Sequence, residues 1–427
     1  MHIIEFPKSN EWHSLVKRPI KDLADIEQIV VPILDDIKIN GDKALLNYVK
    51  KFDSPGLTNL LVSENEVNHA ISQVDSSLKQ AINVAKSNIE KFHSAQKQEI
   101  QKIETTPGVV CWRKNVAIDK VGLYIPGGTA PLFSTVLMLA IPATIAGCKE
   151  IILVTPANTS GNVHPAILYT ASICGINKIF KAGGAQAIGA LAFGTDSIPK
   201  CDKIFGPGNQ YVMAAKQLVQ KDGTAIDMPA GPSEVLVIAD ETAHPSYVAA
   251  DLLSQAEHGN DSQVILVATN KDIANQVIEQ TQLQIKALPR IQMASNALDN
   301  SFCIILDDND KIMEFVNSYA PEHLIIASDR PELFADKVQN AGSVFLGHYT
   351  PESAGDYASG TNHTLPTNGY ARAYSGVSLD SFYKKITFQS ISKSGLQNIG
   401  PTIETMAAAE ELQAHKNAVT IRLKDLK

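Results

Sequence analysis

The fold is decided by residues 121–154, which read VGLYIPGGTAPLFSTVLMLAIPATIAGCKEIILV. Short, almost wholly apolar runs at 121–125 and 150–154 stand on either side of an Ala-rich window with helical character. Strands this apolar are typical of parallel sheets that helices cover on both faces. The stretch therefore predicts a strand, a helix and a second parallel strand of one buried sheet.

The same alternation extends along much of the chain. Further short apolar runs occur at 116–118, 178–180 and 203–205, and a second series lies at 233–238, 263–267, 301–306, 323–327 and 342–346. Two such series predict an α/β protein with two doubly wound, incomplete Rossmann-like domains and a cleft between them. Apolar residues at three-to-four spacing predict helices at 26–39, 42–52, 63–70, 76–98 and, in the tail, 403–419.

The composition excludes several classes of function. The chain has 427 residues, 44% hydrophobic and 19% charged, which is ordinary for a globular protein of two or more domains. Its net charge of −8 and the lack of a Lys/Arg run argue against nucleic-acid binding. The most apolar stretch, 132–147, is too short to span a bilayer, and the N-terminus does not resemble a signal peptide, so we expect a cytoplasmic protein.

Glycine-rich turns follow several of the predicted strands. They lie at 126–128, 182–186 and 205–209. In open α/β sheets, ligands bind at the carboxyl ends of strands, where glycines let backbone amides approach a pyrophosphate. The chain has no GxGxxG fingerprint and no Walker A loop, however, and plain tight turns explain the glycines equally well.

Polar residues that could hold a metal ion lie in three separate segments. Gln255 and His258 would share one face of a helix in SQAEHGND (254–261), although a surface histidine is the simpler interpretation. Asp356 lies in a loop too polar for a core, and His415 lies on the last helix, where a solvated face is the alternative. Together the four would form an N2O2 set suited to Zn²⁺, but their spacing does not show that they converge.

An acid and a base stand side by side at Glu322 and His323, just before an apolar run. Adjacent residues of an extended chain point to opposite sides, so the pair would serve two different steps of a reaction. The alternative is a turn residue followed by a capping histidine. His363, seven residues after Asp356, is a candidate for contact with an anion or a substrate. The five cysteines, Cys111, Cys148, Cys174, Cys201 and Cys303, form no CxxC pair and are expected to be structural.

Long motifs along essentially the whole chain resemble the histidinol dehydrogenase family. They are GLYIPGG (122–128), GGAQAIGALAFG (183–194), FGPGNQYV (205–212), DMPAGPSE (227–234), SQAEHG (254–259), YAPEHL (319–324), SAGDYASGTNHTLPT (353–367) and ETMAAAEELQAH (404–415). The resemblance implies a homodimer that oxidises L-histidinol to L-histidine, the last step of histidine biosynthesis, with two NAD⁺ and one Zn²⁺ per site.

The resemblance also implies roles for individual residues. Zinc would be bound by Gln255, His258, Asp356 and His415, and these four residues would also contact substrate. Glu322 and His323 would be the acid/base pair. His323 would also contact substrate. Ser233, His363 and Glu410 would contact substrate, while Tyr124, Gln186 and Asn209 would contact NAD. The C-terminal segment would reach into the neighbouring subunit, so that Glu410 and His415 act in trans. Many family members have glycine where this chain has Glu411, whose carboxylate we expect to face solvent.

The resemblance leads to four expected segments. These are an N-terminal extension (1–24), a first α/β domain with the catalytic loops (25–123 and 235–379), a second α/β domain on the NAD side (124–234), and a C-terminal tail (380–427). Two rival functions stay open at this point. One is a related zinc- and NAD-dependent dehydrogenase of another small diol or amino alcohol, and the other is a zinc-binding or metabolite-sensing dimer without catalytic activity.

Overall fold

The computed structural model describes residues 1–18, 23–127 and 130–426, and the chain divides into two compact units. The first unit contains residues 1–95 and 119–381, and the second contains 96–118 and 382–427. Gly128, the last glycine of the turn expected at 126–128, lies outside the described residues. None of the helices in the described ranges is long and apolar enough to cross a membrane.

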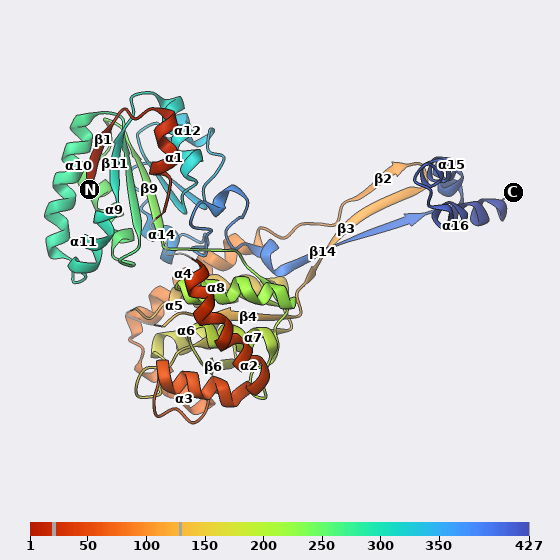
Figure 1. The fold of residues 1–427 in the computed structure, drawn as a ribbon, viewed down its shortest axis with the longest axis horizontal. Helices are drawn as coiled ribbons and strands as arrows, with labels where there is room; N and C mark the ends of the chain where they lie inside the picture. Colours follow the sequence, from red (N-terminus) through yellow and green to blue (C-terminus); the bar gives the residue numbers. More distant parts are fainter. Residues whose placement is uncertain (19–22, 128–129, 427) are drawn as a thin grey trace. The chain divides into compact units, whose positions relative to one another are not determined.

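The first unit contains a six-stranded parallel sheet with the strand order β1-β11-β10-β9-β12-β13. Figure 1 labels β1, β11 and β9 of this sheet. Its strands are β1 (His2–Glu5), β9 (Glu234–Ala239), β10 (Gln263–Ala268), β11 (Phe302–Ile305), β12 (His323–Ala327) and β13 (Ser343–Leu346). Val235 and Val237 face one hydrophobic core, and Leu236 and Ile238 face another. Both faces of this sheet are therefore buried, as the uniformly apolar runs predicted.

Helices cover the two faces of this sheet. The first core includes α9 (Pro245–Ala256), α10 (Lys271–Gln284) and α11 (Ile291–Asp299). The second includes α12 (Asn309–Tyr319), Trp12 of α1 (Trp12–Leu15) and Phe334 of α13 (Glu332–Ala335), and Figure 1 shows α12 and α1 across the sheet from α10 and α11. A short helix, α14 (Glu352–Tyr357), follows the last strand.

A five-stranded parallel sheet forms the rest of the α/β framework, with the order β6-β5-β4-β7-β8. Its strands are β4 (Lys120–Tyr124), β5 (Glu150–Thr155), β6 (Lys178–Lys181), β7 (Lys203–Phe205) and β8 (Ala225–Ile226). The helices between them are α5 (Phe133–Ala146), α6 (Pro165–Ile173), α7 (Gly184–Phe193) and α8 (Gln210–Val219). Residues 121–154 thus form the β4-α5-β5 unit that the sequence predicted.

The N-terminal helices belong with the five-stranded sheet. They are α2 (Leu23–Phe52), which is interrupted at the non-helical Gly41, α3 (Glu64–Gln73) and α4 (Ser76–Ser94). Val30 and Ile37 of α2 share one core with Ile152 of β5 and Ile188 of α7. The expected boundaries, which grouped residues 25–123 with 235–379, therefore differ from the packing, because the apolar stripe of α2 is buried against α7 and α8 rather than against the other sheet.

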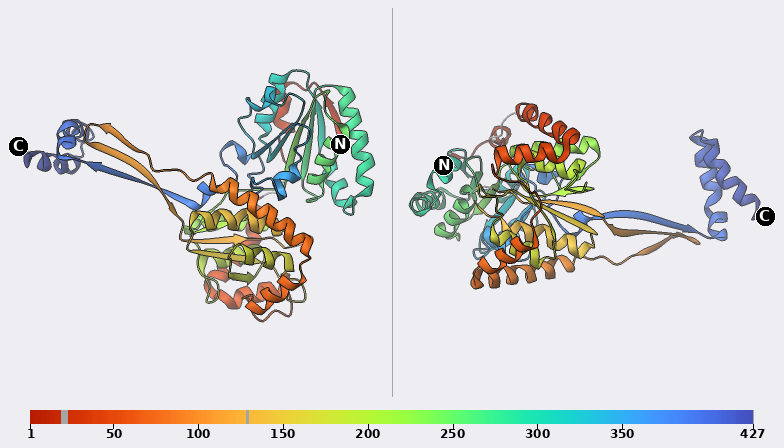
Figure 2. Two further views of the ribbon diagram at one scale, coloured as in Figure 1. Left: turned by 180° about the vertical axis from the view of Figure 1, so that it is seen from behind. Right: turned by 90° about the horizontal axis from the view of Figure 1, so that it is seen from below.

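The second unit combines a three-stranded antiparallel sheet with two helices (Figure 2). The sheet has the order β14-β3-β2, built from β2 (Lys102–Thr106), β3 (Val109–Ala117) and β14 (Tyr383–Ile391). The single helix expected at 403–419 is wrong: α15 (Lys393–Ala409) and α16 (Gln413–Lys424) are separate. The chain turns because Glu411 has a left-handed backbone (φ 59°) and the Leu412 N–H donates to the Ala407 carbonyl at 2.8 Å, a helix-ending pattern that usually contains glycine.

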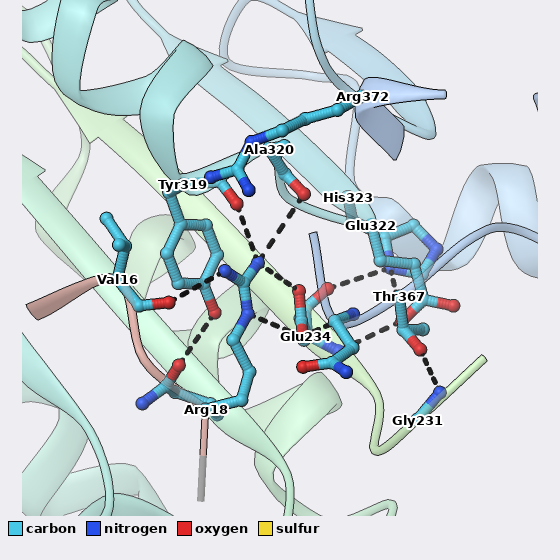
Figure 3. A network of polar contacts seen from close by, with 12 residues as sticks. Val16, Arg18, Gly231, Glu234, Tyr319, Ala320, Glu322, His323, Thr367 and Arg372 are labelled. Carbon is cyan, nitrogen blue, oxygen red and sulfur yellow. Dashed lines mark hydrogen bonds and ion pairs between the residues drawn. The ribbon is translucent and has the colours of Figure 1, made fainter. Parts of the chain in front are cut away.

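A buried ion pair joins the N-terminal segment to the six-stranded sheet (Figure 3). Arg18 donates from Nε and Nη2 to the two carboxylate oxygens of Glu234 at 2.9 and 2.8 Å. The guanidinium also lies 3.6 Å from the ring centre of Tyr319 and donates to the Tyr319 carbonyl at 2.8 Å. Both charged side chains are almost inaccessible, at 5% and 0% exposure. Because Glu234 is the first residue of β9, this pair holds the amino end of the sheet.

Replacing Arg18 with Met leaves the Glu234 carboxylate buried without its counter-charge. We expect the free energy of unfolding to fall by about 3–5 kcal/mol, measured by urea denaturation. Adding Glu234→Gln to Arg18→Met should restore part of this loss, because the double variant buries no unpaired charge. A single variant as stable as the parent would show that the pair does not support the fold.

Glu411→Gly should stabilise the protein, because glycine adopts a left-handed backbone without the steric cost of a Cβ atom. The expected gain is about 0.5–1 kcal/mol in thermal unfolding. The matched control is Ala409→Gly at the end of α15, where the backbone is helical and the same new residue should cost about 0.5–1 kcal/mol. A loss of stability in Glu411→Gly would mean that the carboxylate makes a stabilising contact.

Candidate active site and metal centre

The amino ends of β9 and β12 position the acid and the base. The backbone N–H of Glu234 donates to Glu322 Oε2 at 2.9 Å, and the carbonyl of the same residue lies 3.2 Å from His323 Nδ1 (Figure 3). Glu322 Oε2 and His323 Nδ1 are 3.7 Å apart. The expectation that the two side chains point to opposite sides is therefore wrong. Glu322 lies in a bend before β12, after the left-handed Ala320, and not in extended chain.

The hydrogen bond at Nδ1 defines the state of the His323 ring. A carbonyl oxygen can only accept, so Nδ1 carries the hydrogen and Nε2 keeps its lone pair. Nε2 is buried without a hydrogen-bond partner in the described part of the chain, and it lies 3.7 Å from Asp356 Oδ1. Burial lowers the pKa of His323 to about 4, which keeps the imidazole neutral at pH 7. His323 Nε2 is thus a proton acceptor aimed into the site.

Burial acts in the opposite direction on the neighbouring carboxyl group. It raises the pKa of Glu322 well above its ordinary value, despite the hydrogen bond from the Glu234 amide. A carboxylate with a raised pKa is a stronger base than an exposed one. Glu322 and His323 are therefore two proton-accepting groups of different chemistry within one buried site.

Three side chains beside this pair form a cluster able to hold a metal ion. One ligand atom each from His258, Glu352 and Asp356 lies within 4.8 Å of the others. Sequence reasoning missed Glu352, although it is four residues before Asp356 and so lies on the same face of α14. His258 follows the end of α9, and its N–H donates to the Gln255 carbonyl at 3.2 Å.

Gln255 is buried against the same cluster. With its amide nitrogen facing Glu352, it donates to Glu352 Oε1, and its oxygen accepts from the Glu234 N–H at 3.3 Å. Gln255, His258 and Asp356, which come from distant segments of the sequence, are therefore brought together in the first unit. Their oxygen and nitrogen donors are those that Zn²⁺ accepts.

The electrostatics of the cluster fit a bound cation. Burial, and then the charges of Asp356, Glu322 and Asp251, raise the pKa of Glu352 well above its usual range. Several carboxyl groups thus lie in one buried region, where their negative charges would repel one another, and a divalent cation would neutralise them. His258 keeps solvent access, yet the surrounding protein lowers the pKa of its imidazole, which favours the neutral form that binds metals.

Other predicted substrate contacts are distributed between the two units. Ser233 precedes Glu234 directly, and its carbonyl accepts from the Gln263 N–H at 3.1 Å. His363 already has a partner for each ring nitrogen: Nδ1 lies 2.9 Å from the Asp356 carbonyl, and Nε2 lies 3.1 Å from the Thr135 hydroxyl. Glu410 and His415 belong to the second unit, where both are exposed, Glu410 just after α15 and His415 within α16.

The predicted NAD contacts line a single cavity of about 1260 Å³. Tyr124 ends β4, Gln186 lies in the first turn of α7, and Asn209 precedes α8. The Tyr124 hydroxyl accepts from the Gly184 N–H at 3.1 Å, and Asn209 Oδ1 accepts from the backbone of Tyr211 and Val212. The cavity therefore lies at the carboxyl ends of the five-stranded sheet, and its lining includes residues of all three Gly-rich turns.

Burial keeps several of the cysteine thiols unreactive. All five thiols are free, and three of them are buried. Burial raises the pKa of Cys148 to about 11 and those of Cys174 and Cys303 to about 12, which keeps these thiols protonated and unreactive.

Known proteins of one family are similar to this chain over almost all of its length. The family model described as histidinol dehydrogenase matches residues 16–423. A histidinol dehydrogenase of Bacteroides thetaiotaomicron is 57% identical over 427 residues, the whole of both chains, and one of Escherichia coli is 52% identical over 98% of this chain and 96% of the relative. The crystal structure of histidinol dehydrogenase from Elizabethkingia anophelis is 61% identical and superimposes with a TM-score of 0.97, covering 100% of this chain and 98% of that one.

The motifs, the two parallel sheets and these relatives all agree over the length of the chain, and the protein therefore belongs to the histidinol dehydrogenase family of oxidoreductases.

Proposed function

We propose that the protein oxidises L-histidinol through L-histidinaldehyde to L-histidine, the final step of histidine biosynthesis, with two molecules of NAD⁺ as hydride acceptors. The observation that carries the proposal is the buried lone pair of His323 Nε2, which lies 3.7 Å from Asp356 Oδ1 of the His258–Glu352–Asp356 cluster, while Glu322 lies 3.7 Å from the other ring nitrogen, Nδ1. A metabolite sensor would need no buried base of this kind. We expect the enzyme to work in the cytoplasm.

We propose one Zn²⁺ per subunit, bound by Gln255, His258 and Asp356 together with His415 of the partner subunit. Zinc would orient the imidazole and amine of the substrate, which are good zinc ligands when neutral. Ser233 and His363 would contact the substrate, as would Glu410 of the partner subunit. The homodimer is supported by exposed apolar side chains of the second unit, among them Ile386, Phe388 and Met406, which a partner would cover.

The two bases take part in successive steps. In the first oxidation, His323 Nε2 accepts the hydroxyl proton as the carbon-bound hydrogen leaves as hydride to NAD⁺, which yields the aldehyde and NADH. Glu322 then removes a proton from water as the water oxygen adds to the aldehyde carbon. His323 returns the proton it took in the first step to the carbonyl oxygen, which gives the hydrated aldehyde and frees Nε2 for the second oxidation. In the second oxidation, His323 again accepts a hydroxyl proton while a second NAD⁺ takes the hydride. Tyr124, Gln186 and Asn209 would contact the nicotinamide dinucleotide in the cavity.

The reaction itself is tested by the ratio of products. L-Histidinol and NAD⁺ should give two NADH for each L-histidine, measured by absorbance and amino-acid analysis. A chelator should abolish the activity and Zn²⁺ should restore it. His258→Ala should retain little zinc after dialysis by elemental analysis, while His13→Ala, at an exposed histidine, should retain as much as the parent.

Zinc-loaded protein that forms no NADH from L-histidinol would overturn the proposed substrate. A screen of other amino alcohols and diols would then follow. A full complement of zinc in His258→Ala would remove His258 from the ligand set.

Because Glu322 and His323 act in different steps, substitutions of the two residues should have different effects. His323→Asn should lower the rates of both oxidations by roughly 10²–10⁴-fold. Glu322→Gln should slow oxidation of L-histidinaldehyde more than oxidation of L-histidinol, because only the aldehyde step needs a water molecule to be deprotonated. Each step is measured by NADH formation from the respective substrate. Equal losses in Glu322→Gln would contradict its role with water, and normal alcohol oxidation in His323→Asn would contradict the role of His323.

A further inference from the structure

Asp53 places a carboxylate at the amino end of α7, inside the proposed dinucleotide cavity. It directly follows α2, and its Oδ2 accepts from the Gly183 N–H at 3.0 Å. The next amide, Gly184 N–H, donates to the Tyr124 hydroxyl. The amino end of a helix is a favourable site for phosphate when its first N–H groups are free. Here both amides have a protein partner, and one of the partners is an anion.

Within the part of the chain that the structure describes, Asp53 has no cationic partner in the cavity, whereas the nearby carboxylate of Glu66 has one. Glu66 also lines the cavity, but Lys181, itself 6% exposed, forms an ion pair with it. Among the described residues, the Gly183 amide is the hydrogen-bond donor to Asp53, and no Lys or Arg lines the cavity. Burial raises the pKa of Asp53 to about 6, so the carboxyl group is still mostly ionised at neutral pH.

A separate feature of the cavity indicates that it receives a polar ligand. Thr155 ends β5, is fully buried and lines the same cavity. Its hydroxyl makes no hydrogen bond within the described ranges. A buried hydroxyl without a partner is costly, so a ligand that bonds to it is favoured. The cavity thus offers a neutral hydrogen-bonding group at the end of one strand and a negative charge at the neighbouring helix.

We propose that Asp53 keeps the pyrophosphate of the dinucleotide away from the amino end of α7 and thereby weakens dinucleotide binding, most of all for the reduced form. NADH carries one more negative charge than NAD⁺, so a fixed carboxylate repels it more strongly. The inference rests on the proposed function, in which two NAD⁺ act in succession, so that the first NADH must leave before the second NAD⁺ can enter. Asp53 would favour this exchange.

The test is Asp53→Asn, which removes the charge and keeps an oxygen that accepts from Gly183. Dissociation constants are measured without histidinol, for NADH by fluorescence titration and for NAD⁺ by competition with NADH. We expect NADH to bind roughly 3- to 10-fold more tightly in the variant, with a smaller gain for NAD⁺. Asp35→Asn is the matched control, because it makes the same charge change at an exposed position of α2 and should leave both constants unchanged.

Each result decides the proposal. Weaker NADH binding in Asp53→Asn would mean that the carboxylate holds the ligand, and unchanged binding would mean that its charge does not affect the dinucleotide. Either result overturns the inference. A parent protein that binds no NADH would also overturn it. Asp53→Ala, a second substitution without the charge, should also tighten NADH binding if Asp53→Asn folds poorly. Because no histidinol is present, tighter NADH binding would stand even if L-histidinol proved not to be the substrate.

Discussion

The site depends on one buried charge and its neutralisation. Glu234 begins β9 with its carboxylate fully enclosed, a placement that is tolerated because Arg18 donates to both oxygens and Asn368 adds a backbone N–H. With the side chain held in this way, the two backbone groups of Glu234 lie where they receive Glu322 and His323. Arg18, an N-terminal residue distant in sequence from every candidate site residue, therefore helps to set the positions of Glu322 and His323.

The candidate sites of the two parallel sheets lie at opposite ends of their strands. The five-stranded sheet follows the usual rule, with its cavity at the carboxyl ends of the strands beside the Gly-rich turns. In the six-stranded sheet, Glu322 and His323 lie at the amino ends of β9 and β12. The first residue of β9 there offers an N–H to the Glu322 carboxylate and a C=O to the His323 ring.

Elements whose stability comes from burial on both sides were predicted well from the sequence. The runs at 150–154 and 263–267 became β5 and β10, because a strand covered by helices must be apolar throughout. β2 and β14 were missed: most of their residues are exposed, so alternation and apolar content are weak, and pairing with β3 brings them together from positions far apart in the chain. The break between α15 and α16 was missed because Glu411 has a left-handed backbone, and a glutamate in the sequence does not predict that conformation.

The α/β class and the two series of strands could be predicted from the residue pattern alone, and the long motifs predicted the family and the candidate residues. Only the tertiary structure brought Gln255, His258 and Asp356 together, turned Glu322 and His323 towards each other, and added Glu352, Glu234, Arg18 and Asp53, which no local pattern singled out. The physical reason is that periodicity records which face of an element is buried. Which polar side chains meet depends on strand order and on contacts between residues that are hundreds of positions apart.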